Sequence, residues 1–294
     1  MNSKLKGSLY LLTATLIWGT TFVAQSVGMD HVGPISFQAI RTMLAALFLC
    51  IVIFITEKGR ISGFLSHWRN PRLWKAGLLC GAALFLAANL QQLGLVQSDA
   101  GKAGFITAMY IVLVPVFGIF LKKKPPLSCV FSVAIAMVGL YMLSGAGING
   151  ISTGDIYLAL CAVAFAVQIT LIDRYAADLE PIALNCIQAL TCSILSFCVV
   201  PFTETITLSG VLEGWFPLCY AGVLSMGIAY SMQIMGQQKL ESTKASLIMS
   251  LESVFAAIAG ALLLHERMTT MELAGCALVF AGVLISQIPS KKTK

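Results

Sequence analysis

The sequence predicts an all-α integral membrane protein whose ten transmembrane helices form two inverted five-helix repeats. The first observation is composition: of the 294 residues, 58% are apolar and 11% are charged, whereas soluble domains carry about 25% charged residues. The second is a set of ten apolar runs long enough to cross a bilayer. The third is an echo of the first half of the chain in the second half, which is typical of an internal repeat.

The apolar runs come five to each half of the chain. A transmembrane helix needs about 20 mainly apolar residues to cross about 30 Å of hydrocarbon. The first run follows Lys4 and Lys6 as a signal peptide would, but it is long for one and has no clear cleavage site, so we expect a retained helix. The ten runs are 7–27, 35–55, 74–95, 101–121, 127–144, 155–172, 181–201, 214–236, 243–264 and 270–288.

The echo is clearest between Asn89–Phe105 and Ser231–Leu247, which match at an offset of 142 residues. It continues at an offset of 147 toward the N-terminus and 143 toward the C-terminus, a drift that small loop insertions explain. We therefore expect one repeat at residues 1–147 and a second at 148–294. Matched pairs include Gly7 with Gly154, Pro34 with Pro181, Gln91 with Gln233, Gly94 with Gly236, Lys102 with Lys244 and Gly139 with Gly282.

Basic residues predict the orientation of the helices. If the N-terminus is cytoplasmic, sixteen of the 19 Lys and Arg residues lie on the cytoplasmic side, and only Lys102 and Arg267 lie outside. Cytoplasmic loops carry such an excess, so we expect both termini in the cytoplasm and the 145–154 linker outside the cytoplasmic membrane. The net charge of +6 is then a topology signal, and no nucleic-acid partner is expected. An odd number of helices per repeat inverts the second repeat.

Inverted repeats are typical of secondary transporters, whose substrate site lies near the bilayer midplane where the repeats meet. The sequence therefore predicts a transporter that moves a small polar or amphipathic metabolite by alternating access.

Several motifs resemble the EamA family of the drug/metabolite transporter superfamily. Trp18-Gly19 is similar to its WG signature, and Pro34 followed by Arg41 is similar to the start of its second helix. Residues 245–255 (ASLIMSLESVF) with 264–266 (LHE) resemble its ninth helix and "LGE" ending, although Ser253 stands where proline is common and His265 where glycine is usual. The resemblance covers almost the whole chain. It implies ten helices, cytoplasmic termini and transport, often export, of amino acids or other small metabolites.

Two ionisable residues lie well inside predicted helices, Arg41 and Glu252. Such groups are costly in hydrocarbon and normally face the protein interior or a watery cavity. One interpretation is an internal ion pair that only holds helices together. The other is control of a polar substrate or of a coupling proton, and we expect the two residues to influence each other through contact or a shared cavity.

Further polar residues recur at i, i+3 spacing and so share helix faces. Because amides facing lipid would lack hydrogen bonds, we expect them to point inward, either lining a cavity or bonding between helices. The full predicted substrate-binding set is Trp18, Thr21, Gln25, Gln38, Arg41, Asn89, Gln92, Tyr110, Gln168, Gln188, Tyr230, Gln233 and Glu252.

Several motifs of other classes are missing from the sequence. It contains no P-loop, HExxH or CxxC pattern, so we expect neither an enzyme nor an ATP-driven pump, and no cofactor or metal. The expected partners are a small-molecule substrate and the lipid bilayer, with a proton as candidate coupling ion, in a monomer or homodimer. The alternatives are an intramembrane enzyme acting on a lipid-linked substrate, which would need clustered acids, and a non-transporting receptor or scaffold, which would not need a polar lining in both halves.

Overall fold

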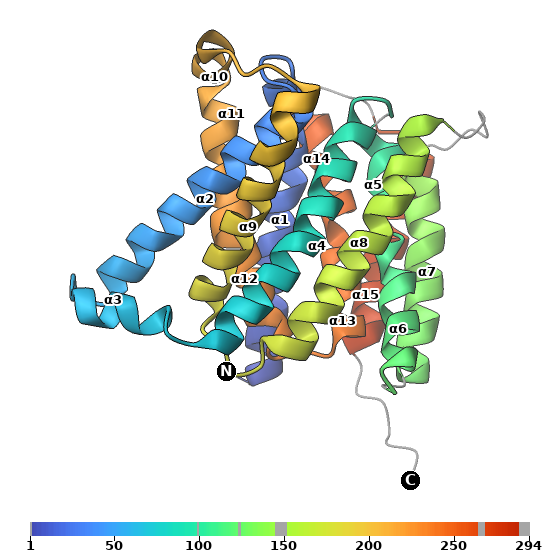
Figure 1. Cartoon of the computed structure of the whole chain (residues 1–294). Coiled ribbons are helices and arrows are strands. Elements are labelled where there is room, and N and C mark those ends of the chain that lie inside the picture. Colours follow the sequence, from blue (N-terminus) through green and yellow to red (C-terminus); the bar gives the residue numbers. More distant parts are fainter. Residues whose placement is uncertain (1, 99, 123–124, 145–151, 264–267, 288–294) are drawn as a thin grey trace.

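The computed structural model describes residues 2–98, 100–122, 125–144, 152–263 and 268–287, and over these residues the chain is a helical bundle without strands (Figure 1). In this described part, nine helices are long and apolar enough to cross a membrane, and Leu127–Leu143 is a shorter apolar helix. The prediction of an all-α, multi-pass membrane protein is confirmed, with one helix or broken helix for each predicted run. The motif at 264–266 and most of the linker lie outside the described residues.

Three of these nine helices are built from several helical segments: α5 with α6, α11 with η1 and α12, and α13 with α14. Two short helices, α3 and α10, lie in connections between spans. In chain order the elements are α1 (Ser3–Met29), α2 (Pro34–Thr56), α3 (Ile61–His67), α4 (Pro71–Leu95), α5 (Ala100–Ala108), α6 (Tyr110–Phe120), α7 (Leu127–Leu143), α8 (Thr153–Tyr175), α9 (Pro181–Thr203), α10 (Leu208–Glu213), α11 (Trp215–Cys219), η1 (Tyr220–Ala229), α12 (Tyr230–Gln237), α13 (Ser242–Met249), α14 (Leu251–Leu263) and α15 (Thr270–Gln287).

The starts of the helices follow from local sequence. Proline occupies the first turn of α2, α4 and α9, at Pro34, Pro71 and Pro181, where its missing N–H costs no intrahelical hydrogen bond. A capping box begins α8: the Asp155 N–H donates to the Ser152 hydroxyl, and the Asp155 carboxylate accepts from the Ser152 N–H.

Glycines that match in the echo make equivalent close contacts at opposite ends of the bundle. A Cβ added to Gly7 in α1 would lie 3.2 Å from the Gly236 carbonyl oxygen of α12. A Cβ added to Gly94 in α4 would lie 3.2 Å from the Gly154 carbonyl oxygen of α8. Gly7 corresponds to Gly154 in the repeat, and Gly236 corresponds to Gly94. The two contacts are therefore the same contact made once by each half, which is what a two-fold relation between the halves requires.

The last helix of each half pairs with the other in the same manner. Gly139 of α7 packs against Gly275 of α15, and Gly282 of α15 packs against Ser132 of α7; added Cβ atoms at Gly139 and Gly282 would lie 2.7 and 2.8 Å from those partners' carbonyl oxygens. At the offset of 143, these two contacts are again repeat mates. Small residues allow this close backbone approach in membranes, where helix association relies on packing.

Matched interruptions occur in the fourth helix of each half. The helical pattern is broken at Met109, between α5 and α6, and at Ser250, between α13 and α14. The Ser250 hydroxyl donates to the Leu247 carbonyl at 2.7 Å, a local bond that competes with the helical pattern. Tyr110 and Glu252, which the echo pairs, follow these interruptions within two residues.

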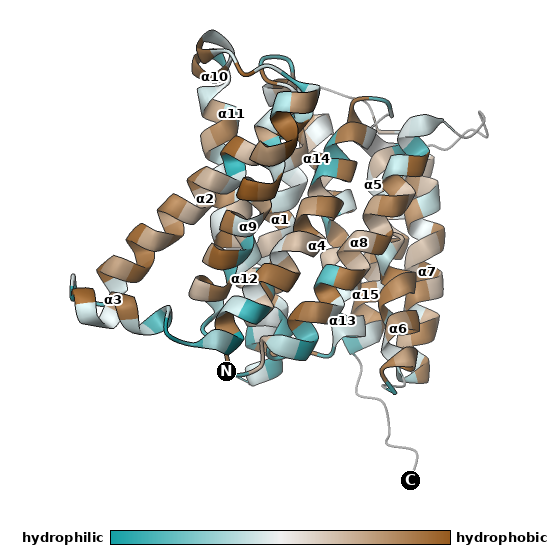
Figure 2. Ribbon diagram, viewed as in Figure 1, coloured by the Kyte–Doolittle hydropathy of each residue, from teal (hydrophilic) through white to brown (hydrophobic). Residues whose placement is uncertain are grey.

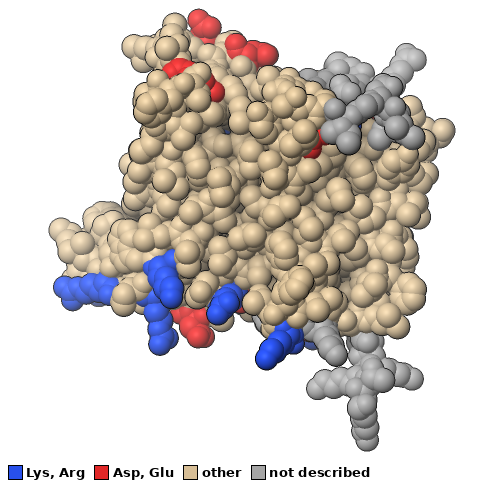
Figure 3. Space-filling view, turned by 45° about the vertical axis from the view of Figure 1, so that its right-hand side comes forward, with Lys and Arg blue, Asp and Glu red and all other residues tan. Residues whose placement is uncertain are grey.

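The surface has the polarity of a membrane protein. The ribbon is mainly hydrophobic along the sides of the bundle, and hydrophilic residues gather toward its two ends (Figure 2). Ile51, Phe131 and Leu284 are among the exposed large apolar residues. Helix α1 begins and α15 ends at the same end (Figure 1). In the view of Figure 3, Lys and Arg collect at that end and Asp and Glu mainly at the other.

Candidate functional site

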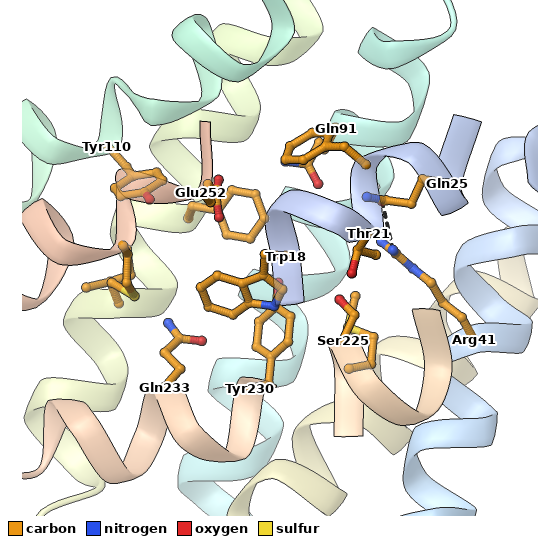
Figure 4. A pocket seen from close by; sticks show the side chains of 15 residues that line it. Trp18, Thr21, Gln25, Arg41, Gln91, Tyr110, Ser225, Tyr230, Gln233 and Glu252 are labelled. Atoms are coloured by element: carbon orange, nitrogen blue, oxygen red, sulfur yellow. Dashed lines mark hydrogen bonds between the residues drawn. The ribbon is translucent and has the colours of Figure 1, made fainter. Parts of the chain in front are cut away.

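A cavity lies in the centre of the bundle, between elements of both halves (Figure 4). Its volume is about 40 Å³, room for a few water molecules, so this conformation is contracted around the site. The lining residues are Trp18, Thr21, Phe22, Gln25, Arg41, Gln91, Tyr110, Phe165, Ile169, Ser225, Met226, Tyr230, Gln233, Met249 and Glu252.

Arg41 is held at one end of this cavity by neutral amides. The guanidinium donates from Nη1 to Gln25 Oε1 at 2.7 Å and from Nε to Gln38 Oε1 at 2.6 Å. Gln38 lies one turn before Arg41 on α2, so the spacing itself creates this contact. The side chain is 2% exposed, and no carboxylate of the described residues lies within ion-pair distance of it. A buried cation without a counter-ion therefore faces the cavity.

Glu252 lies toward the other end of the cavity, near Tyr110 (Figure 4). Its side chain is 7% exposed, and it forms neither an ion pair nor a hydrogen bond with any residue in the described part of the chain. The ion pair with Arg41, one of the two interpretations of the sequence, is thus not formed in this conformation. The two groups instead share one cavity.

Three more buried polar atoms of the lining lack partners within the described residues: Trp18 Nε1, the Tyr110 hydroxyl and Gln233 Oε1. Such groups are rare in folded proteins, because each costs about 1–3 kcal/mol when unpaired. The indole of Trp18 packs edge-to-face on Tyr230, with ring centroids 5.0 Å apart. A polar ligand or water in the cavity would satisfy these atoms.

Eight of the predicted site residues therefore line the cavity: Trp18, Thr21, Gln25, Arg41, Tyr110, Tyr230, Gln233 and Glu252. The other five, Gln38, Asn89, Gln92, Gln168 and Gln188, are also buried but lie outside the lining.

These five amides bond between or along helices, as the alternative interpretation of the sequence allowed. Gln168 donates to Gln188 at 3.1 Å and accepts from Gln233 at 3.2 Å. Asn89 donates to the Ser196 hydroxyl of α9 at 2.9 Å, and Gln92 donates to the sulfur of Met29 at 3.4 Å. Helical spacing identifies an inward face but does not distinguish a cavity wall from a helix contact.

Sequence reasoning missed two polar lining residues, Gln91 and Ser225. Gln91 is the repeat mate of the predicted residue Gln233, so the echo carried a signal for it. The other missed lining residues are the apolar Phe22, Phe165, Ile169, Met226 and Met249.

Ser225 lies in a π-helix, η1, which has no evident sequence signal. The Asn185 side chain of α9 stabilises this wide turn by donating to the carbonyls of Met226 and Gly227, at 2.9 and 3.0 Å, and to the Ser231 hydroxyl at 3.0 Å. π-Helical turns often mark functional sites. Here the turn belongs to the segment that presents Ser225, Met226 and Tyr230 to the cavity.

Within the described residues, no group of three or more His, Cys, Asp or Glu side chains is placed to hold a metal ion.

Comparisons with known proteins agree with this architecture. An uncharacterized transporter of Archaeoglobus fulgidus is 31% identical over 290 residues, covering 96% of this chain and 86% of that protein. The uncharacterized transporter YoaV of Bacillus subtilis is 23% identical, covering 98% and 99%. A probable amino-acid metabolite efflux pump of Salmonella typhimurium is 24% identical, covering 96% and 94%.

A solved crystal structure has the same fold, with a TM-score of 0.79 at 19% identity and 96% of each chain covered. The model of the EamA-like transporter family matches the chain twice, at residues 5–145 and 152–287. This protein, with its membrane-spanning helices and a match in each half, belongs to the EamA-like transporter family.

Proposed function

We propose that the protein is a secondary transporter that moves a small polar or amphipathic metabolite, an amino acid or related compound, out of the cell by alternating access. The observation that carries this proposal is the central cavity, in which a buried cation, a buried acid and three unpaired polar atoms face one another. Structural residues alone leave these groups unsatisfied, whereas a polar substrate bonds with them. The Salmonella relative described as an amino-acid metabolite efflux pump favours this substrate class.

Both halves of the chain build the cavity. The first half contributes residues of α1, α2, α4 and α6, and the second contributes residues of α8, η1, α12, α13 and α14. Relative movement of the two repeats would therefore open the site, which in this conformation is too small for an amino acid. The equivalent contacts at the two ends of the bundle support inverted repeats that exchange roles between an inward-open and an outward-open state.

The charge distribution supports the orientation. The basic end of the bundle, where α1 begins, would face the cytoplasm, and the opposite end, where α8 begins, would face outside. The chain has no ATP-binding motif, so a gradient of protons or of the substrate would drive transport. Glu252 is the candidate proton carrier, because it is an unpaired buried acid at the cavity.

Reconstitution tests this function. The purified full-length chain in proteoliposomes, loaded with an unlabelled amino acid, should accumulate the same labelled amino acid by counterflow for at least one member of a panel of amino acids and nucleosides. Liposomes without protein and liposomes with the Arg41→Gln variant are the controls. Absence of counterflow for the whole panel, with a folded and correctly inserted wild-type protein, would refute the proposal.

A further inference from the structure

We propose, building on the transport function above, that the preferred substrate carries an anionic group and a cationic group several bonds apart. The anionic group binds at Arg41 and the cationic group at Glu252. A substrate in which both charges sit on one carbon, such as an α-amino acid with an apolar side chain, engages one end of the site at a time.

The two ends of the cavity differ in chemistry (Figure 4). One end holds Arg41 with Gln25 and Ser225, and Arg41 Nη2 has no hydrogen-bond partner among the described residues. Since Nη1 and Nε are occupied by amides, Nη2 remains to donate to a carboxylate. The arrangement therefore favours an anion at this end.

The opposite end holds Glu252 and Tyr110, with Gln233 nearby (Figure 4). The carboxylate of Glu252, the unpaired Tyr110 hydroxyl and the unpaired Gln233 Oε1 are three oxygen acceptors in the lining of this cavity. An ammonium group has three donors and no acceptor. It matches this set of oxygens.

Trp18 and Tyr230 lie between the two ends (Figure 4). Their rings form an edge-to-face pair with centroids 5.0 Å apart, so the middle of the cavity is apolar and contacts the carbon chain of a substrate. The aromatic pair also separates the charged ends.

The direction of the helices allows this separation to be measured along α1. Gly7 packs against Leu240, and Gly19 packs against Phe255 and Ala256; added Cβ atoms would lie 3.1 Å from Leu240 Cγ and 2.8 Å from Ala256 N. Residue numbers rise together along both helices, so α1 and α14 run in the same direction. Gly19 and Phe255 are at the same level.

Gln25 lies six residues above Gly19, and Glu252 lies three residues below Phe255. At 1.5 Å per residue, their Cα levels differ by about 14 Å. Both side chains tilt toward their own N-termini, and these shifts cancel because the helices are parallel. After allowing for the breadth of the Arg41 guanidinium, roughly 10 Å remains between the charged groups. Two hydrogen bonds of about 2.8 Å leave about 4 Å between the charged atoms of the substrate.

2-Aminobutanoate and 4-aminobutanoate provide a matched test, because they are isomers that differ in the separation of their charges. Each is offered in labelled form to proteoliposomes containing the full-length wild-type chain. We expect 4-aminobutanoate to be exchanged with at least about tenfold higher efficiency than 2-aminobutanoate, which corresponds to about 1.4 kcal/mol. Arg41→Gln and Glu252→Gln should each abolish this preference, whereas Arg41→Lys and Glu252→Asp, which keep the charges, should retain part of it.

Two variants that remove an exposed charge elsewhere, Lys75→Gln and Glu213→Gln, should keep the preference intact. Thermal unfolding in detergent identifies any variant that fails to fold. If Arg41→Gln or Glu252→Gln does not fold, the partial preference expected of Arg41→Lys and Glu252→Asp becomes the test of the inference. Equal or better exchange of 2-aminobutanoate by the wild type, or a preference that survives in both charge-removing variants, would overturn the inference while transport stands. If neither isomer is exchanged but other compounds are, the inference fails and the proposed transport function stands. If nothing moves, the proposed function fails with it.

Discussion

The contact between α7 and α15 leaves no room for a side chain at Gly139, so Gly139→Ala should destabilise the protein. The new Cβ would lie 2.7 Å from the Gly275 carbonyl oxygen and 2.8 Å from the Val279 nitrogen. Both are backbone atoms, so the two helices must separate. Overpacking of this kind lowers the free energy of unfolding by about 1–3 kcal/mol. The higher helix propensity of alanine offsets up to about 1 kcal/mol of this loss.

The matched control is Gly104→Ala, because its Cβ would lie 3.4 Å from the Ser253 hydroxyl, an ordinary contact. The difference between the two variants isolates the packing cost, since both gain the same propensity. Gly282→Ala is the symmetric test: its Cβ would lie 2.8 Å from the Ser132 carbonyl oxygen. The two-fold relation between the halves predicts a comparable loss there.

The assay is thermal unfolding of the detergent-solubilised protein followed by size-exclusion chromatography. Each kcal/mol should lower the Tm by about 2–4 °C, so Gly139→Ala and Gly282→Ala should fall several degrees below Gly104→Ala. If all three variants unfold at the same temperature, the close packing of α7 on α15 is not a stabilising contact and the reasoning is refuted.

Three further predictions concern the site. Arg41→Gln and Glu252→Gln should each abolish or decouple counterflow while the protein still inserts and folds; near-normal transport by both, at equal membrane abundance, would make these residues structural. Trp18→Phe removes an indole N–H that has no partner among the described residues, so counterflow should fall while the protein still folds; unchanged counterflow would show that the indole N–H does not serve the substrate. Asn185→Leu leaves the carbonyls of η1 unpaired, which should cost about 1–3 kcal/mol and lower the Tm; an unchanged Tm would show that the π-helix does not depend on Asn185.

The helices and their pairing across the halves were accessible from the sequence because both depend on repeated local features. Length and hydropathy identify a membrane-spanning run, and Pro34 and Pro181 mark equivalent helix starts. The echo likewise predicted equivalence for Gly94 and Gly236, which the structure places in matching contacts. Breaks inside a membrane-spanning helix were not predictable in this way, because no proline or glycine occurs in the turn before the interruption at Met109.

The site was accessible only in part. Arg41 and Glu252 are conspicuous because charge is rare in a membrane helix, and both line the cavity. Periodicity selected Asn89 and Gln92 on α4, yet the cavity is lined by Gln91. Which of two neighbouring inward positions meets a cavity depends on the packing of other helices, and that information is absent from the spacing of residues on one helix.

Access to the cavity from both sides of the membrane tests the central claim most directly. A single cysteine at Gln91, in a background whose nine native cysteines are replaced, would be labelled in sealed vesicles with a membrane-impermeant thiol reagent. The reagent would be applied from the cytoplasmic side and, in separate vesicles, from the opposite side. We predict labelling from either side, with substrate gradients shifting the balance between them. Labelling from one side alone under every gradient, or from neither, would contradict alternating access through this cavity.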